Sequence, residues 1–201
     1  MHLTTTYLQK SARTRLLREP EPWPPAPPAD VMAWFIDARN DMIQLFADLG
    51  PEAPSHTWQP SDQTVGFWMR RMAVETAIHT GDLEATSGNR SPIGAPLALD
   101  GIDEALHILL AGDWSDDPHP GDNHRVRLMA GDRGWVVTLT ADRVTVEDGV
   151  PEPGPREGVI SASPSALLLW LWRRLPDERV EQAGNRAAVA RPRDWMASVT
   201  S

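Results

Sequence analysis

Apolar residues recur every three or four positions through the first half of the chain, which is the spacing of amphipathic helices. Asp30 stands where an N-cap belongs, and the apolar run that follows it ends at Gly50. Ser61 or Asp62 begins the next run, which ends at Gly88. The pattern therefore predicts a series of amphipathic helices. We expect these helices at 2–18, 31–49, 62–88 and 97–111, with an extended proline-rich connector at 19–28.

The period of the apolar pattern falls to two after Asn123, and this change indicates strands. The alternating runs are short and are separated by turn-forming residues, as in an antiparallel meander. Ser163-Pro164 then has the pattern of an N-cap followed by a proline at the first helical position. The expected strands are 124–130, 135–140, 143–147, 158–162 and 180–183, and the expected helices are 166–172 and 186–199.

The stretch between these two patterns is acidic and rich in turn formers, which is typical of a segment between domains. We therefore expect a helical bundle at 1–113, a linker at 114–123 and a small α+β domain with an antiparallel sheet at 124–201. The predicted fold class of the whole chain is α+β. With 201 residues, the chain is long enough to form one medium or two small hydrophobic cores.

Composition and charge exclude several classes of function. The chain has 28 acidic and 19 basic residues, so its net charge of −9 disfavours nucleic acid as a partner. It has no cysteine, so any thiol chemistry must use a thiol from another molecule. No apolar run approaches the roughly 20 residues of a transmembrane helix, and the first residues lack a secretion signal. We expect a cytoplasmic protein without a transmembrane segment.

Glu75 and His79 are the strongest candidates for metal ligands. They are four residues apart, so both project from one face of one expected helix, and that face is otherwise apolar. A divalent metal would compensate the cost of burying the carboxylate there, and zinc accepts both donor types. The alternative is an ordinary Glu-His pair, or a glutamate neutralised by Arg70 or Arg71.

A third ligand must come from another part of the chain, because one helix face offers little more than this pair. Each candidate has an ordinary structural interpretation. His2 is the second residue of the chain, where a terminus frays. His107 lies in an apolar run and suits a core or boundary imidazole, whereas the rest suit surface loops. The candidates are His2, His56, His107, His119 and His124.

Three further side chains belong to the candidate site. Asp82 is seven residues after Glu75 and thus on nearly the same helix face, where it would orient His79 or contact substrate. A solvated residue near the helix end is the alternative. Arg70 and Arg71 suit a substrate carboxylate, which an arginine binds through two parallel hydrogen bonds. Such a pair also suits the solvated face of a helix.

Two blocks of sequence resemble the mycothiol-dependent maleylpyruvate isomerase family. Residues 66–82, followed by Asp-Gly-Ile-Asp-Glu at 100–104, are similar to the metal-binding domain of that family, which is a DinB-like four-helix bundle. Residues 167–176 and the Gly-Asn-Arg turn at 184–186 are similar to its C-terminal α+β domain. The two blocks occur in the expected order and cover most of the chain.

The resemblance implies a zinc ion held by His2, Glu75 and His79. It also implies mycothiol, a low-molecular-weight thiol, as the second cofactor. Zinc deprotonates a bound thiol and so supplies the nucleophile that this chain lacks. The implied reaction is isomerisation of a small electrophile of the maleylpyruvate type, or addition or transfer of the thiol to one.

The chain departs from the family pattern in two places. The family's first helix, which lies upstream of the early histidine, is absent, so the coding start is misplaced or the bundle is shortened. An incomplete bundle exposes an apolar groove, which we expect a homodimer or another partner to cover. Thr80 replaces a common arginine and puts nearby substrate contacts in doubt. The shortened front end and its expected open groove favour an alternative function, a non-catalytic metal-binding regulatory or partner-docking module.

Overall fold

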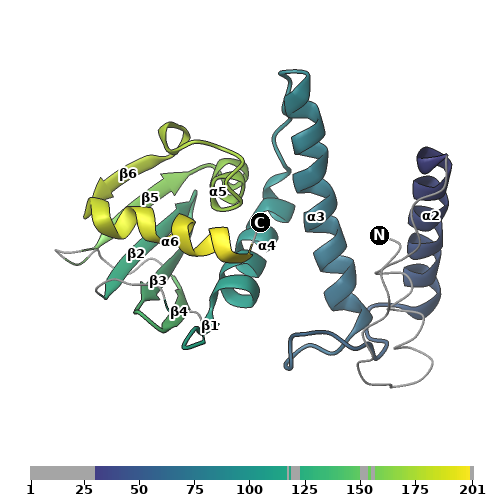
Figure 1. The fold of residues 1–201 in the computed structure, drawn as a ribbon, viewed down its shortest axis with the longest axis horizontal. Helices are drawn as coiled ribbons and strands as arrows, with labels where there is room; N and C mark the ends of the chain where they lie inside the picture. The colour runs from purple at the N-terminus through teal and green to yellow at the C-terminus, as the bar shows by residue number, and fades with distance from the viewer. Residues whose placement is uncertain (1–29, 117, 119–122, 150–153, 155–156, 200–201) are drawn as a thin grey trace. The chain divides into compact units, whose positions relative to one another are not determined.

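The computed structural model describes residues 30–116, 118, 123–149, 154 and 157–199 (Figure 1). The chain consists of two compact units, 1–75 and 76–201, each with its own internal contacts. The units therefore divide earlier in the chain than the expected linker at 114–123. The expected helix at 2–18 and the connector at 19–28 lie outside the described residues.

The first unit contains helix α2 (Val31–Leu49) and the beginning of helix α3 (Val65–Thr86). The Asp30 carboxylate accepts a hydrogen bond from the Ala33 backbone N–H at 2.9 Å, which confirms the predicted N-cap. α2 then ends at Gly50, whose positive φ of 75° suits a residue without a side chain. The period of the sequence thus placed this helix correctly at both ends.

Helix α3 begins three residues later than the predicted start at 62, because the preceding residues form a hydrogen-bonded loop. The Thr64 hydroxyl donates to the Asp62 carboxylate at 2.7 Å and accepts from the Phe67 backbone N–H at 3.4 Å. Thr64 is therefore the residue that satisfies the first turn of α3.

A six-stranded sheet forms the centre of the second unit, with the strand order β1-β4-β3-β2-β5-β6. Strands β2, β3 and β4 form the predicted antiparallel meander. One pairing differs from the expectation, because β5 lies parallel to β2. The strands are β1 (Gly112–Asp113), β2 (His124–Ala130), β3 (Arg133–Leu139), β4 (Arg143–Asp148), β5 (Gly158–Ala162) and β6 (Glu181–Gly184).

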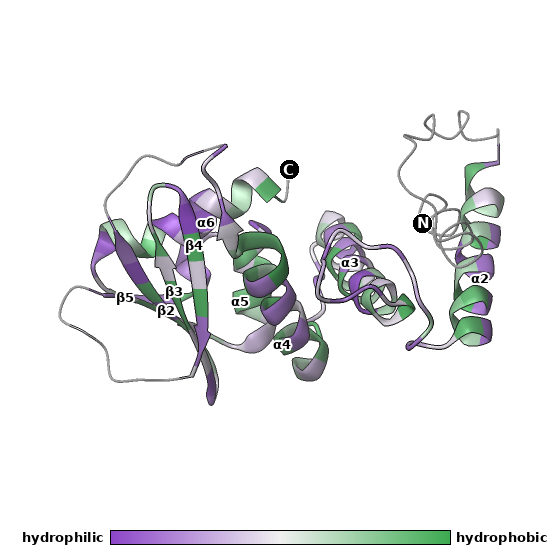
Figure 2. Ribbon diagram, turned by 90° about the horizontal axis from the view of Figure 1, so that it is seen from below, coloured by the Kyte–Doolittle hydropathy of each residue, from purple (hydrophilic) through white to green (hydrophobic). Residues whose placement is uncertain are grey.

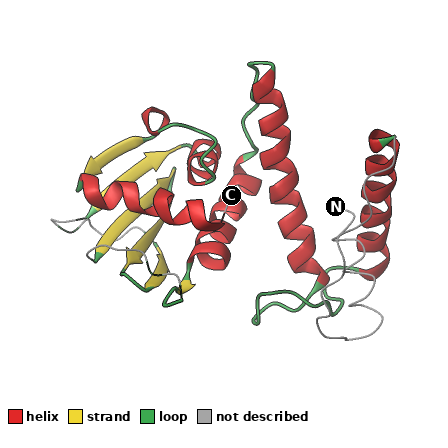
Figure 3. Cartoon of the chain, in the orientation of Figure 1, coloured by secondary structure: helices red, strands yellow, loops and turns green. Residues whose placement is uncertain are grey.

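Helices pack on this sheet and on one another (Figure 3). α6 (Arg186–Val199) contacts β2, β3, β5 and β6, and it can be followed in yellow across the sheet in Figure 1. α5 (Pro164–Leu171) packs against α4 (Ala95–Glu104). Between α4 and β1, the π-helix η1 (Ala105–Leu110) takes the place of the last turns of the predicted helix. The 3-10 helix η2 (Asp177–Arg179) precedes β6.

Three tryptophans of the second unit are at most 1% exposed. They are Trp135 on β3, Trp170 on α5 and Trp195 on α6. Pro192 lies inside α6, and the helix nevertheless runs without interruption from Arg186 to Val199. Among the described residues, no helix combines the length and the apolar character needed to cross a membrane.

A buried ion pair joins β2 to the residue before β5. Arg127 donates a hydrogen bond to the Glu157 carboxylate at 2.8 Å, and the Glu157 side chain is only 8% exposed. This hydrogen bond holds the pKa of Glu157 below its usual value. Because the folded pKa is lowered, the pair stabilises the fold above the unfolded value of about 4.5 and loses that contribution as the pH falls through the folded pKa.

Glu157→Gln is therefore expected to lower the free energy of unfolding by about 3 kcal/mol at pH 7, because it leaves a buried guanidinium without its anion. The loss of unfolding free energy should become smaller as the pH is lowered. Thermal unfolding between pH 7 and pH 3 measures the loss and its pH dependence. Glu147→Gln is the matched control: this carboxylate is 66% exposed and lies 3.5 Å from Arg125, which also pairs with Glu157. Equal losses in the two variants would contradict the prediction.

Candidate functional site

Glu75 and His79 both lie on α3, one helical turn apart, as the sequence predicts. The Glu75 carboxylate forms an ion pair with Arg71, the residue one turn before it. Its side chain is 22% exposed. This ion pair agrees with the alternative interpretation, in which Arg70 or Arg71 neutralises the glutamate.

The His79 ring is held by Asp82, three residues further along α3. His79 Nδ1 lies 3.2 Å from Asp82 Oδ2, so the carboxylate accepts the proton when it is carried on Nδ1. That tautomer places the lone pair on Nε2, the nitrogen that faces away from Asp82. A carboxylate that orients the other ring nitrogen is the usual partner of a metal-binding histidine.

Asp82 is itself fixed by two arginines that the sequence did not indicate. Arg90 Nη2 lies 3.2 Å from Asp82 Oδ1, and Arg174 Nε lies 3.3 Å from Asp82 Oδ2. Arg90 also donates to the backbone carbonyls of Gly81 and Arg174, at 3.0 and 3.1 Å. The only sequence signal for Arg174 was its place in the block 167–176 that resembles the family.

The burial of α3 differs from the prediction toward its C-terminal end. We expected Glu75, His79 and Leu83 to share a buried face, but His79 is 59% exposed and Leu83 is 72% exposed. The fully buried residues of this part are Val74 and Ile78. The buried face of α3 is thus shifted by one residue in each turn from the face that carries Glu75 and His79. The one-turn spacing of Glu75 and His79 is as predicted, but the cost of burying a carboxylate no longer argues for a metal between them.

The remaining predicted site residues are placed as follows. Arg71 contacts Glu75, as described, and Arg70 is half-buried on the same helix. His2, the third ligand implied by the resemblance, lies outside the described residues. The role of each residue as a ligand or a substrate contact therefore stays a prediction.

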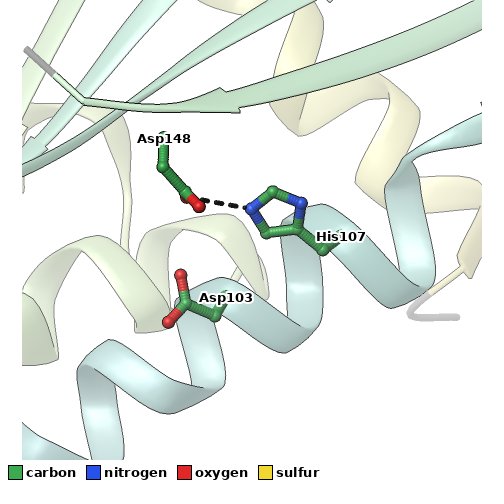
Figure 4. A group of neighbouring side chains, drawn as sticks. All are labelled: Asp103, His107 and Asp148. Atoms are coloured by element: carbon green, nitrogen blue, oxygen red, sulfur yellow. Dashed lines mark hydrogen bonds and ion pairs between the residues drawn. The ribbon is translucent and has the colours of Figure 1, made fainter. Parts of the chain in front are cut away.

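A second group of metal-binding residue types lies in the second unit (Figure 4). One ligand atom each from Asp103, His107 and Asp148 lies within 4.8 Å of the others. His107 Nε2 is 3.1 Å from Asp148 Oδ1. Asp103 accepts hydrogen bonds from Arg133 at 2.8 Å and from Trp135 Nε1 at 2.7 Å. The group joins α4 and η1 to β3 and the end of β4.

The sequence pattern does not indicate this group. His107 was expected to be a core or boundary imidazole, and its side chain is indeed partly buried, at 34% exposed. Asp103 and His107 are four residues apart, a signal as strong as that of Glu75 and His79. Asp148 comes from β4, and only the register of the sheet brings it to them.

Comparisons with known proteins give one sequence match and several weak structural ones. No curated protein matches the chain. A double mutant of the sec-alkyl sulfatase PisA1 is 14% identical, with a TM-score of 0.38, over 54% of this chain and 17% of that one. The sec-alkylsulfatase Pisa1 from Pseudomonas sp. is 14% identical, with a TM-score of 0.32, over 53% of this chain and 15% of that one. The UbiJ-SCP2 ubiquinone synthesis protein is 15% identical, with a TM-score of 0.30, over 55% of this chain and 94% of that one.

The sequence match covers two of the three predicted ligands, and His2 lies just before it. The family model of the mycothiol maleylpyruvate isomerase N-terminal domain matches residues 3–84. This range includes Glu75, His79 and Asp82, and it ends two residues before the end of α3. The N-terminal part of the chain, residues 3–84, is therefore similar to the mycothiol maleylpyruvate isomerase N-terminal domain.

Proposed function

We propose that this chain is a zinc-dependent enzyme that uses mycothiol to isomerise a small electrophile of the maleylpyruvate type, or to add or transfer the thiol to one. The observation that carries the proposal is the place of Glu75 and His79 on α3, inside the range that matches the family. The ligands are Glu75, His79 and His2.

The donor set fits a zinc ion. Zinc binds imidazole nitrogen and carboxylate oxygen, and a catalytic zinc keeps one coordination position open. His79 has the outer carboxylate that such a ligand usually has, at 3.2 Å. Arg71 is the competing cation on Glu75, so Glu75 must exchange one contact for another or share its two oxygens between them.

The residues around the proposed metal site then have separate roles. Asp82 fixes the tautomer and the direction of the His79 ring, and Arg90 and Arg174 hold Asp82 in place. The exposed His79 leaves an approach for a solute molecule from solvent. When bound, zinc lowers the pKa of a thiol so that it reacts as a thiolate at neutral pH. A chain without cysteine has no thiol of its own that would compete.

One feature favours the second candidate function, a metal-binding module that docks a partner. Helix α2 exposes several large apolar side chains, most of them in its first two turns, and hydrophobic residues can be seen on this helix in Figure 2. Scattered apolar residues are normal on a surface, but a cluster of them favours contact with another surface. The exposed residues are Val31, Met32, Phe35, Ile36 and Ile43.

An assay of the full zinc-loaded chain tests the proposed function. Maleylpyruvate consumption should require both the protein and mycothiol, and S-methylated mycothiol should not support it. A second assay replaces maleylpyruvate by 1-chloro-2,4-dinitrobenzene, which reports thiol transfer. A chain that carries zinc on Glu75 and His79 but is inactive in both assays would overturn the enzymatic function and favour the docking module.

A further inference from the structure

We propose that Asp103, His107 and Asp148 bind a divalent transition metal, at a site in the second unit that is separate from Glu75 and His79. The three residues provide two carboxylates and one imidazole, with ligand atoms within 4.8 Å of one another (Figure 4). The inference is independent of the proposed function, because it uses none of the same residues.

The backbone brings the three donors together from ordered elements. Asp103 is on α4 and His107 is on the π-helix that continues it, so the two lie about one turn apart. Asp148 ends β4, whose register is fixed by its pairing with Trp135 on β3. Single-turn π segments occur frequently at functional sites. The donors therefore do not depend on the conformation of a long loop.

Neighbouring side chains orient the Asp103 carboxylate. The Nε1–H group of Trp135, a fully buried side chain, donates to Oδ1 at 2.7 Å, and Arg133 donates to Oδ2 at 2.8 Å. Hydrogen bonds of this kind hold metal-ligating carboxylates in place. Each carboxylate oxygen has two lone pairs, so it can accept one hydrogen bond and still bind a metal.

Charge favours a cation at this position. With His107 neutral, the two carboxylates and the Arg133 guanidinium sum to a charge of about −1. In its present contact, His107 Nε2 faces Asp148 Oδ1, and a metal between them would replace the proton that they share.

The donor types select the class of metal. An imidazole nitrogen favours Zn²⁺, Co²⁺ or Ni²⁺ over Mg²⁺ and Ca²⁺, which prefer oxygen ligands throughout. The Asp148 side chain is 65% exposed, so water completes the coordination. A site with three protein ligands that is open to water binds a metal reversibly from solution.

Isothermal titration calorimetry of the full chain with ZnCl₂ tests the site. The measurement is made in a Glu75→Gln/His79→Ala background, so that only sites outside the proposed catalytic pair contribute. One equivalent of zinc should bind in this background. Adding His107→Gln or Asp148→Asn should weaken binding at least 10-fold, whereas MgCl₂ should give no saturable heat.

His124→Gln and Asp132→Asn are the matched controls, because they remove one imidazole and one carboxylate elsewhere in the same unit. Zinc should raise the unfolding temperature of the controls and not that of the His107 and Asp148 variants. The inference is overturned if the background variant binds no zinc, or if its affinity is unchanged by His107→Gln and Asp148→Asn. In that case the three residues are only an ion-pair network between helix and sheet.

Discussion

His79→Ala is expected to remove zinc from the N-terminal part of the chain and to lower the mycothiol-dependent rate at least 100-fold. Loss of an outer partner of a metal site typically costs 10- to 100-fold, and loss of a ligand itself should cost more. Glu75→Gln should have the same direction, because the amide has no negative charge to offer the ion. Elemental analysis after exhaustive dialysis and steady-state rates measure the two effects. A second metal site complicates the zinc content, so the comparison is made in the Asp148→Asn background.

Asp82→Asn is expected to have a smaller effect than loss of a ligand. The amide keeps the shape of the side chain but cannot accept the His79 proton as a carboxylate does, so we expect an intermediate loss of 10- to 100-fold in zinc affinity. Asp132→Asn, in the turn between β2 and β3, is the control for an exposed aspartate. Zinc content and rate that stay at the parent level in both Glu75→Gln and His79→Ala would refute the proposed ligands.

Gly184→Ala is expected to destabilise the second unit by about 3–4 kcal/mol. Gly184 has a φ of 76°, where an alanine costs about 1 kcal/mol or more. In addition, a Cβ atom here would collide with the carbonyl oxygen of Glu157, the residue before the neighbouring strand β5. That oxygen also accepts the backbone N–H of Asn185 at 3.1 Å, so moving it disturbs the start of α6. The unfolding temperature should fall by about 10 °C.

Gly131→Ala separates the cost of the backbone conformation from the cost of the steric collision. Gly131 lies in the same unit with a φ of 65°, but a Cβ atom there would meet nothing within 4 Å. We expect a loss of about 1 kcal/mol from the backbone conformation alone. Thermal or denaturant unfolding of both variants gives the comparison. Equal losses would mean that the collision with Glu157 is relieved by a small shift of β6.

The fold was predictable where a local pattern determines the structure. The two-residue period gave β2 and β4 almost to the residue, and the Ser163-Pro164 pair gave the start of α5. The parallel pairing of β5 with β2 was not predictable, because alternation shows that a segment is a strand but not which neighbour it takes. The π-helix at Ala105–Leu110 also has no counterpart in the apolar spacing.

The candidate sites show the same limit. Two residues one turn apart on a helix can be found from sequence, as Glu75 and His79 were. Their exposure could not, because the apolar positions of α3 fit two neighbouring faces, and tertiary packing selects the one with Val74 and Ile78. Asp148 reaches His107 across 41 positions of sequence, which only the sheet register specifies. Arg90 and Arg174 likewise meet at Asp82 through the packing of the second unit.

The strand order has a consequence for synthesis on the ribosome. β2, β3 and β4 are consecutive hairpins and can pair as they emerge, but the other side of β2 is completed only by β5, about 30 residues later. Until then β2 presents unpaired backbone groups along Val126–Ala130, beside apolar side chains that the finished fold buries. Nascent chains that stall before Gly158 thus expose a strand edge that can pair with the strand of another chain.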